Sequence, residues 1–210
     1  MTKKPQRDAE KTKEDLLCAA ENEFSQKGFY GARIDEIARG AGVNKRMIYE
    51  YFTSKEGLYK AVLTRVYRRL CEREVGVLSE NITPEEAIYK IIHMYFEFLN
   101  SNETFVHLVL WENLNEARYL KELSLLDIKE PTIELLRKVI EGGKKEGAFR
   151  REIDTDQVIL SIMTYTFSYF SNRYTMSVLM HRDLKQEENL RARVKEVTDM
   201  FLSYLCKSSK

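Results

Sequence analysis

The sequence contains few of the residues that build disulfide-rich, zinc-binding or fibrous proteins. Its 210 residues include three Cys, three Pro, nine Gly and three His. Cys18, Cys71 and Cys206 are odd in number and far apart, which argues against a disulfide framework or a zinc ribbon and favours reduced thiols. The histidines have no close His or Cys neighbour, so we expect neither a metal nor a cofactor. His93 and Glu97 are spaced like a surface pair on a helix.

Long apolar runs are also missing. No stretch reaches the roughly 18 to 20 apolar residues that cross a bilayer, and the polar start from Met1 to Lys13 lacks the apolar core of a secretion signal. We therefore expect a cytoplasmic protein without a membrane anchor. An enzyme is the main alternative from another functional class. The sequence has no Gly-rich phosphate loop, nucleophile elbow or His-Glu-x-x-His motif, which argues against it.

Charge of one sign is not in excess over the whole chain, since the formal net charge is +1. The distribution is uneven, however. Residues 1–75 contain 16 Lys and Arg against 12 Asp and Glu, whereas residues 76–210 contain 18 against 21. The basic excess at the front fits a polyanion-binding segment, and it also fits an ordinary solvated helix face.

Helical patterns fill most of the chain. Hydrophobic residues make up 43% and charged residues 32%, a balance typical of a helix-rich globular protein. Gly28 is a natural helix stop, Ser54 can cap a long helix, and Thr83 with Glu86 forms a capping box. The sequence predicts an all-α fold of about nine helices, near residues 12–27, 34–41, 45–52, from 55 onward, 84–100, 103–119, 127–146, 154–181 and 186–206.

Two short helices in succession, between Arg33 and Tyr59, have the pattern of a helix-turn-helix. Ala38 is small enough for a second helix to cross close by, Gly42 suits a turn with positive φ, and Ile48 fills the angle between the helices. The alternative for this spacing alone is an ordinary helical hairpin that packs closely. In a helix-turn-helix, the side chains at the start of the second helix enter the major groove of DNA. These are Asn44, Lys45, Arg46 and Met47.

A wider match supports the helix-turn-helix. The run KGFYGARIDEIARGAGVNKRMIYEYFTSKEGLYKAVL resembles the tetracycline-repressor (TetR/AcrR) family of regulators over about the first 65 residues. The resemblance implies a three-helix DNA-binding domain in which residues from Lys45 to Tyr51 face the operator, with Tyr49 and Lys55 holding phosphates. A phenol hydroxyl and an ammonium at a helix N-terminus suit that role. The alternative for Tyr49 is a core aromatic.

At two positions the chain departs from the family pattern. Arg33 stands where the family usually has Ser or Thr, and Arg46 stands where it usually has a small residue. Arg33 therefore cannot supply the usual hydroxyl cap, although its charge can restore a phosphate contact.

The C-terminal part has its own resemblance. Three segments, FVHLVLWENLNEARYL, GGKKEGAFRREIDTDQ and FSYFSNRYTMSVLM, resemble the branch of the family that contains the pyrimidine-utilisation repressor. A shared body does not fix the ligand, so no pyrimidine is assigned. Aromatic walls with a few polar groups are typical of small-molecule pockets, although each such residue has the helical core or the dimer seam as its alternative. The candidate pocket residues are His107, Trp111, Tyr165, Phe167 and Asn172.

Together these patterns predict a homodimeric transcription regulator. Residues 1–54 form the DNA-binding domain, and residues 55–210 form a helical bundle for ligand binding and dimerisation through the last two helices. We expect a repressor that leaves double-stranded operator DNA when a small-molecule effector binds. A regulator controlled by a protein partner, or an activator, is the alternative. The predicted DNA-binding residues are Arg33, Asn44, Lys45, Arg46, Met47, Tyr49, Tyr51 and Lys55.

Overall fold

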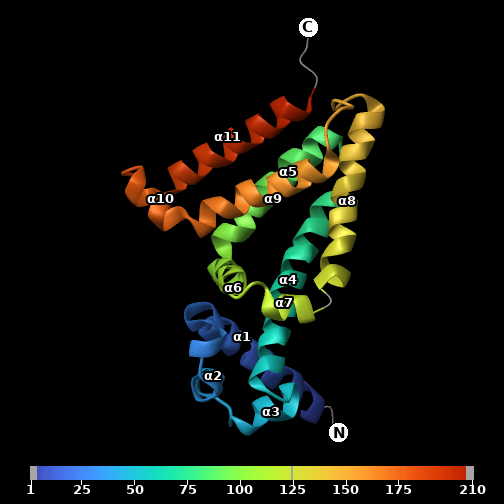
Figure 1. Cartoon of the computed structure of the whole chain (residues 1–210). Coiled ribbons are helices and arrows are strands. Elements are labelled where there is room, and N and C mark those ends of the chain that lie inside the picture. Colours follow the sequence, from blue (N-terminus) through green and yellow to red (C-terminus); the bar gives the residue numbers. More distant parts are fainter. Residues whose placement is uncertain (1–3, 124, 207–210) are drawn as a thin grey trace. The chain divides into compact units, whose positions relative to one another are not determined.

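The computed structural model describes residues 4–123 and 125–206 and confirms the all-α fold (Figure 1). Within these residues the only pairing of strand type is an isolated bridge between Phe149 and Cys206. The described residues form eleven helices: α1 Lys4–Gly31, α2 Ile34–Gly40, α3 Arg46–Phe52, α4 Lys55–Leu78, α5 Pro84–Ser101, α6 Glu103–Leu114, α7 Arg118–Glu122, α8 Leu125–Glu146, α9 Thr155–Ser171, α10 Arg173–Leu179 and α11 Glu187–Leu205.

The expected number of about nine helices is too low, because two predicted helices are each broken in two. The predicted helix near 103–119 ends at Leu114, since Glu116 and Ala117 both adopt φ of 56°. The predicted helix near 154–181 breaks at Asn172, which has φ −111° and ψ 2°. The side-chain amide of Asn172 donates to the carbonyl of Ser168 at 3.0 Å, a local bond of the kind that competes with helix continuation.

The predicted helix ends are confirmed where a specific side chain or glycine fixes them. At the start of α5, the Thr83 hydroxyl accepts from the amide of Glu86 at 3.2 Å, and the Glu86 carboxylate accepts from the amide of Thr83 at 3.1 Å. The Ser54 hydroxyl accepts from the amide of Gly57 at 2.9 Å at the start of α4. In α1 the backbone leaves helical geometry at Gly28, where φ is 66°.

Packing divides the chain into two compact units, each built from two stretches of sequence. The head unit comprises Met1–Arg68 and Glu103–Leu125, and the body unit comprises Arg69–Asn102 and Leu126–Lys210. The head unit therefore contains α6 and α7 as well as the predicted DNA-binding helices. The predicted functional division at residue 54 stays a prediction.

Each unit has its own apolar core. In the head unit, α1 packs against α2 and α6, and Leu16, Ala20 and Phe24 of α1 are fully buried. In the body unit, α5 is the central helix, and α9 and α11 both pack on it (Figure 1). Ile88, Ile91 and Ile92 of α5 are fully buried. None of the helices in the described part of the chain has the length and apolar character needed to span a membrane.

Candidate DNA-binding site and effector groove

A glycine turn joins α2 to α3 in the head unit. Gly42 has φ +66°, and no atom lies within 4 Å of the place where its Cβ would stand, so the left-handed backbone rather than crowding selects glycine. The amide of Val43 donates to the carbonyl of Ala38 at 3.0 Å and closes the turn. The predicted positive φ at Gly42 is confirmed.

One side of α3 is fixed in the core of the head unit. Ile48 is fully buried, Phe52 is almost so, and the small side chain of Ala38 on α2 is buried as well. Because α3 has only seven residues, burial of this side leaves the other side open. Arg46 and Tyr49 are exposed there.

Asn44 bonds the start of α3 from the position before the N-cap. The helix begins at Arg46, and Lys45 occupies the N-cap position without a side-chain capping bond. The side-chain oxygen of Asn44 accepts from the amide of Arg46 at 2.9 Å. The sequence favours Asn44 as the N-cap residue, as Asn is a preferred N-cap, and this is wrong by one position, although the Asn44 side chain does bond one of the free amides at the helix start.

All eight predicted DNA-binding residues reach the surface of the head unit. Tyr49 is 52% exposed, so the alternative in which it is a core aromatic is wrong. Met47, Tyr51 and Lys55 are half-buried. The exposed members of the set are Arg33, Asn44, Lys45, Arg46 and Tyr49.

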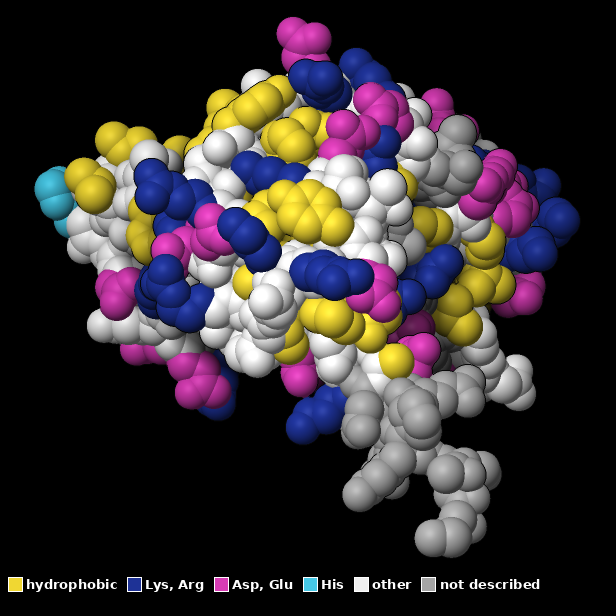
Figure 2. Space-filling model, turned by 90° about the horizontal axis from the view of Figure 1, so that it is seen from below, with side chains coloured by type: hydrophobic (Ala, Val, Ile, Leu, Met, Phe, Trp, Pro, Cys, Tyr) yellow, Lys and Arg dark blue, Asp and Glu magenta, His cyan; other side chains and the backbone are white. Residues whose placement is uncertain are grey.

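The charges around this surface are mixed. The Lys45 ammonium lies 3.1 Å from the Asp35 carboxylate on α2, and Arg39 pairs with Glu36 at 2.8 Å. Figure 2, seen from below the view of Figure 1, shows Lys and Arg side chains beside Asp and Glu side chains, with hydrophobic side chains between them. Among the described residues Arg46 has no ion-pair partner. Binding of a polyanion to this surface therefore has to rely on contacts of individual side chains, because the described residues of the surface form no large patch of positive charge.

Lys55 is engaged within the head unit. Its ammonium donates to the carbonyl of Ala32 at 2.5 Å and lies 4.9 Å from the ring centroid of Phe29. Burial lowers the pKa of Lys55. The ammonium thus fastens the start of α4 to the connector between α1 and α2, next to Arg33. Its predicted contact with a DNA phosphate stays a prediction.

A buried carboxylate that the sequence analysis missed connects three helices of the head unit. Glu112 on α6 is 2% exposed and accepts from the Tyr59 hydroxyl on α4 at 2.9 Å. It also accepts from the amides of Tyr119 and Leu120 on α7, both at 3.1 Å. Burial together with the nearby Glu112 carboxylate raises the pKa of Tyr59. No local motif marks Glu112, because its partners come from separate helices.

Two of the candidate pocket residues lie on α6 and therefore in the head unit. The Trp111 indole donates to the carbonyl of Ser25 at 3.1 Å, and its ring lies 2.8 Å from the position of a Cβ on Gly28. This close approach explains why a glycine stands at position 28. His107 is half-buried on the same helix. Trp111 thus packs against α1 of the head unit.

The other three candidates lie in the body unit, on α9 and at its end. Tyr165 lines a small groove of about 250 Å³ between α9 and α11. Phe167 is half-buried, and Asn172 makes the helix break described above. None of the described pockets brings Tyr165 together with another member of the predicted set. The ligand-binding role of all five residues stays a prediction.

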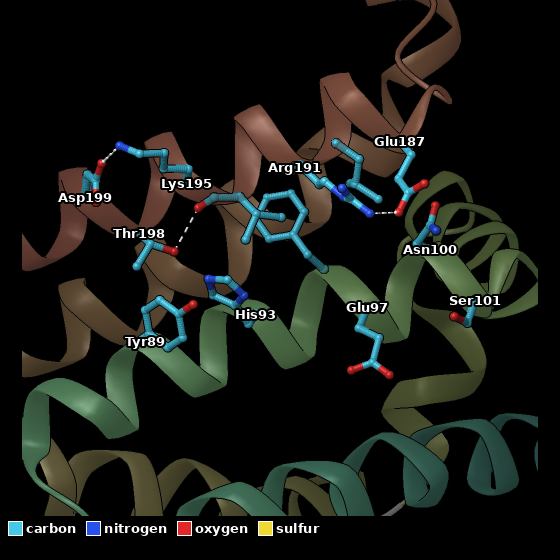
Figure 3. A pocket seen from close by; sticks show the side chains of 13 residues that line it. Tyr89, His93, Glu97, Asn100, Ser101, Glu187, Arg191, Lys195, Thr198 and Asp199 are labelled. Atoms are coloured by element: carbon cyan, nitrogen blue, oxygen red, sulfur yellow. Dashed lines mark hydrogen bonds and ion pairs between the residues drawn. The ribbon is translucent and has the colours of Figure 1, made fainter.

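A larger groove, which the sequence analysis did not find, lies between α5 and α11 of the body unit. Its volume is about 680 Å³, and its apolar floor includes Phe96 and Val194. Figure 3 shows Tyr89 and His93 on α5 beneath Lys195 and Thr198 on α11. The lining residues are Tyr89, His93, Phe96, Glu97, Asn100, Ser101, Glu187, Leu190, Arg191, Val194, Lys195, Thr198 and Asp199.

The polar groups of this groove pair along their own helix or with α4. His93 stacks on Tyr89 with ring centroids 4.0 Å apart, and burial lowers the pKa of His93. Glu97 pairs with Arg73 at 3.2 Å, so the predicted surface pair of His93 and Glu97 is wrong. Lys195 pairs with Asp199 on α11 at 2.5 Å. A ligand here would meet an apolar floor, an aromatic stack and charges that can change partners.

Metal ligation has no support in the described part of the chain. No three His, Cys, Asp or Glu side chains there come together in a way that could hold an ion. The three cysteines are free, as predicted; Cys18 is exposed and Cys71 is buried.

Family models and curated relatives match both parts of this chain. Residues 16–62 match the model for bacterial regulatory proteins of the tetR family, and residues 84–201 match the tetracyclin repressor-like C-terminal domain. The HTH-type transcriptional repressor NicS of Pseudomonas putida is 32% identical over 181 residues, which cover 86% of this chain and 85% of NicS. The HTH-type transcriptional regulator RutR of Escherichia coli is 32% identical over 157 residues, which cover 75% of this chain and 73% of RutR.

Solved structures share the fold. The fatty acid degradation regulator FadR from Bacillus halodurans superposes with a TM-score of 0.72 at 23% identity, covering 96% of this chain and 97% of that chain. An exposed face of α3 on a buried support and two matching family models thus point to the same conclusion. The chain belongs to the TetR family of bacterial regulators and is a DNA-binding transcriptional regulator.

Proposed function

We propose that the protein is a homodimeric repressor that binds a palindromic operator and leaves it when a small molecule binds the body unit. The observation that supports this most directly is the exposed start of α3, held in place by the buried Ile48 and Phe52. A repressor of this kind acts in the cytoplasm, where bacterial DNA lies.

The proposed contacts divide between bases and phosphates. Asn44, Lys45, Arg46 and Met47, at the start of α3, meet base edges in the major groove. The phosphate contacts come from Arg33, Tyr49, Tyr51 and Lys55. The unpaired guanidinium of Arg46 is suited to a guanine, with which Arg can form two hydrogen bonds.

A dimer follows from the small size of the reading helix. Seven residues contact few base pairs, and two copies spaced by about 34–36 Å engage successive turns of the major groove. We place the dimer contact on α9 and α11, the last two long helices. Residues 1–54 then serve as the DNA-binding domain, and residues 55–210 serve ligand binding and dimerisation.

For the effector we propose the groove between α5 and α11 as the first site to test. Its volume of about 680 Å³ is within the range of small-molecule sites. His107, Trp111, Tyr165, Phe167 and Asn172 remain the candidates from sequence. Membership of the pyrimidine-utilisation branch is supported by the likeness to RutR, but NicS has the same identity over a longer stretch, so we assign no pyrimidine ligand.

Release is proposed to act through α4, which runs from Lys55 to Leu78 and contributes residues to both units. An effector that favours one body conformation shifts this helix and with it the DNA-binding surface. Linkage then requires that the operator and the effector weaken each other's binding by the same factor.

A selection from random DNA duplexes tests the proposal without knowledge of the operator. The purified protein should enrich a two-fold symmetric sequence, and its affinity for that sequence should fall steeply as salt rises. Arg46→Ala should change the enriched bases, whereas Leu114→Ala, at an exposed position of α6, should not. Enrichment of no symmetric sequence would contradict the proposed operator binding.

A further inference from the structure

The short helix α10 presents an unusual run of exposed apolar side chains. Of its seven residues only Arg173 is buried. Val178, Leu179 and Met180, at its C-terminal end, are 73%, 67% and 68% exposed. Exposing three consecutive apolar side chains to water is unfavourable in an isolated monomer, and such patches mark protein–protein or ligand contact surfaces.

The backbone around these residues is held firmly by the body unit. The Tyr169 hydroxyl on α9 donates to the carbonyl of Leu184 at 2.8 Å. The Ser177 hydroxyl accepts from the amide of Leu184 at 3.1 Å, and the Lys185 ammonium lies 4.8 Å from the ring centroid of Tyr174. The turn after α10 is therefore preorganised with its apolar side chains outward. We call residues 173–181 the arm.

A small groove lies between α9 and α11 of the body unit. It is about 250 Å³ in volume, and its lining includes Ser161 together with Tyr165, Met200 and Tyr204. These three larger residues are 42%, 40% and 51% exposed. The groove lies near the N-terminal end of α9 and the C-terminal end of α11, whereas the arm joins the opposite ends of the same two helices.

We propose that the arm of one copy inserts Val178, Leu179 and Met180 into the α9–α11 groove of a second copy. In a two-fold dimer each surface meets its symmetry mate, so helices that cross the axis run antiparallel. The arm end of one face then meets the groove end of the other, and the contact occurs twice. This inference rests on the proposed homodimer and adds the residues that fix its register.

The exposed apolar area is adequate for such an interface. Side chains of this size present on the order of 100 Å² each when half exposed. The arm, the groove and Leu160 of α9 together offer nine such residues, an area comparable to the ~800 Å² that each partner buries in a standard interface. These are Leu160, Tyr165, Tyr174, Met176, Val178, Leu179, Met180, Met200 and Tyr204.

Sedimentation velocity over a range of concentrations tests the arm. Met180→Glu should raise the dimer dissociation constant on the order of 100-fold, because a buried contact is lost twice. Leu114→Glu is the matched control, since Leu114 is an apolar residue of the head unit that is 76% exposed. It should leave dimerisation unchanged. Adding Met200→Lys to Met180→Glu should restore most of the affinity, because the two introduced charges then meet across the interface.

The possible outcomes distinguish failure of the arm contact from failure of the homodimer proposal. A wild-type protein that stays monomeric at high micromolar concentration overturns both the proposed homodimer and the arm. A wild-type dimer that Met180→Glu does not weaken overturns the arm alone, and so does a loss that Met200→Lys fails to repair. If circular dichroism shows that Met180→Glu loses helix, the milder variants Val178→Ser and Met180→Ser are judged by the same criterion.

Discussion

The two units each bury a carboxylate, but they satisfy it in different ways. In the head unit, Glu112 accepts hydrogen bonds from one phenol and two backbone amides. In the body unit, Glu74 of α4 is 1% exposed and accepts from the Lys129 ammonium at 2.5 and 2.6 Å and from the Tyr95 hydroxyl at 2.5 Å. One carboxylate depends on neutral donors, and the other on a buried cation.

The two sets of hydrogen bonds depend on different features of the structure around each buried carboxylate. The bonds to Glu112 require that the backbone after α6 turns sharply, and the amide of Ala117 donates to the Glu112 carbonyl at 2.7 Å in that turn. The bonds to Glu74 require that α8 stays against α4, because Lys129 lies on α8. The head site is thus sensitive to backbone geometry and the body site to loss of charge balance.

The largest effect should come from removing the cation of the body site. Lys129→Met leaves the Glu74 charge buried without its counterion and should lower the free energy of unfolding by about 3–5 kcal/mol. Urea denaturation measures the change. Glu74→Leu combined with Lys129→Met should regain most of it, and Lys195→Met, at an exposed pair, should stay close to wild type. A double variant as unstable as the single one would mean that packing, not charge, dominates the site.

A smaller effect is expected in the head unit. Glu112→Leu leaves the Tyr59 hydroxyl and two amides of α7 unpaired and should cost about 2–3 kcal/mol. Glu112→Gln keeps one acceptor oxygen and should cost less. Hydrogen exchange at the amides of Tyr119 and Leu120 should become faster in both variants. Unchanged protection of these amides would show that the carboxylate does not hold α7.

The comparison extends to DNA binding, which should respond to side chains that reach the surface of the head unit. Arg46→Ala should reduce discrimination between operator and mismatched duplexes by about 1–3 kcal/mol. Lys55→Ala should weaken binding to all duplexes about equally, because a phosphate contact has no base preference. Fluorescence anisotropy with both kinds of duplex separates the two results. Neither variant should alter the dimer dissociation constant, in contrast to Met180→Glu.

The smallest effect is a pH dependence that both buried sites share. Burial and the adjacent carboxylate raise the pKa of Tyr59 and of Tyr95 above the value of 10.0 for a free tyrosine. Above pH 10 the unfolded chain loses these protons while the folded chain keeps them, so stability falls as pH rises. The slope is about 1.4 kcal/mol per pH unit for each tyrosine at most. Tyr59→Phe and Tyr95→Phe should each reduce the slope between pH 10 and 11 and leave it unchanged near pH 8.

Local patterns predicted the parts of the fold that depend on neighbouring residues. The capping box at Thr83, the positive φ at Gly42 and the burial of Ile48 are set within a few residues, and the structure confirms them. The break at Asn172 was missed because apolar spacing continues through it. The α5–α11 groove was missed because its walls, near Tyr89 and Lys195, are about a hundred residues apart in the chain.

The sequence by itself determined that the chain is all-helical, that its N-terminal part contains a helix-turn-helix and that the protein is a regulator. Helix caps, turn glycines and apolar periodicity act over one or two turns, and a sequence records them directly. Only the tertiary structure decided that Trp111 packs on Gly28, that Glu112 and Glu74 are buried with partners, and that the arm is exposed. These features depend on which distant helices meet, and hydrophobic packing brings distant helices together without leaving a local pattern.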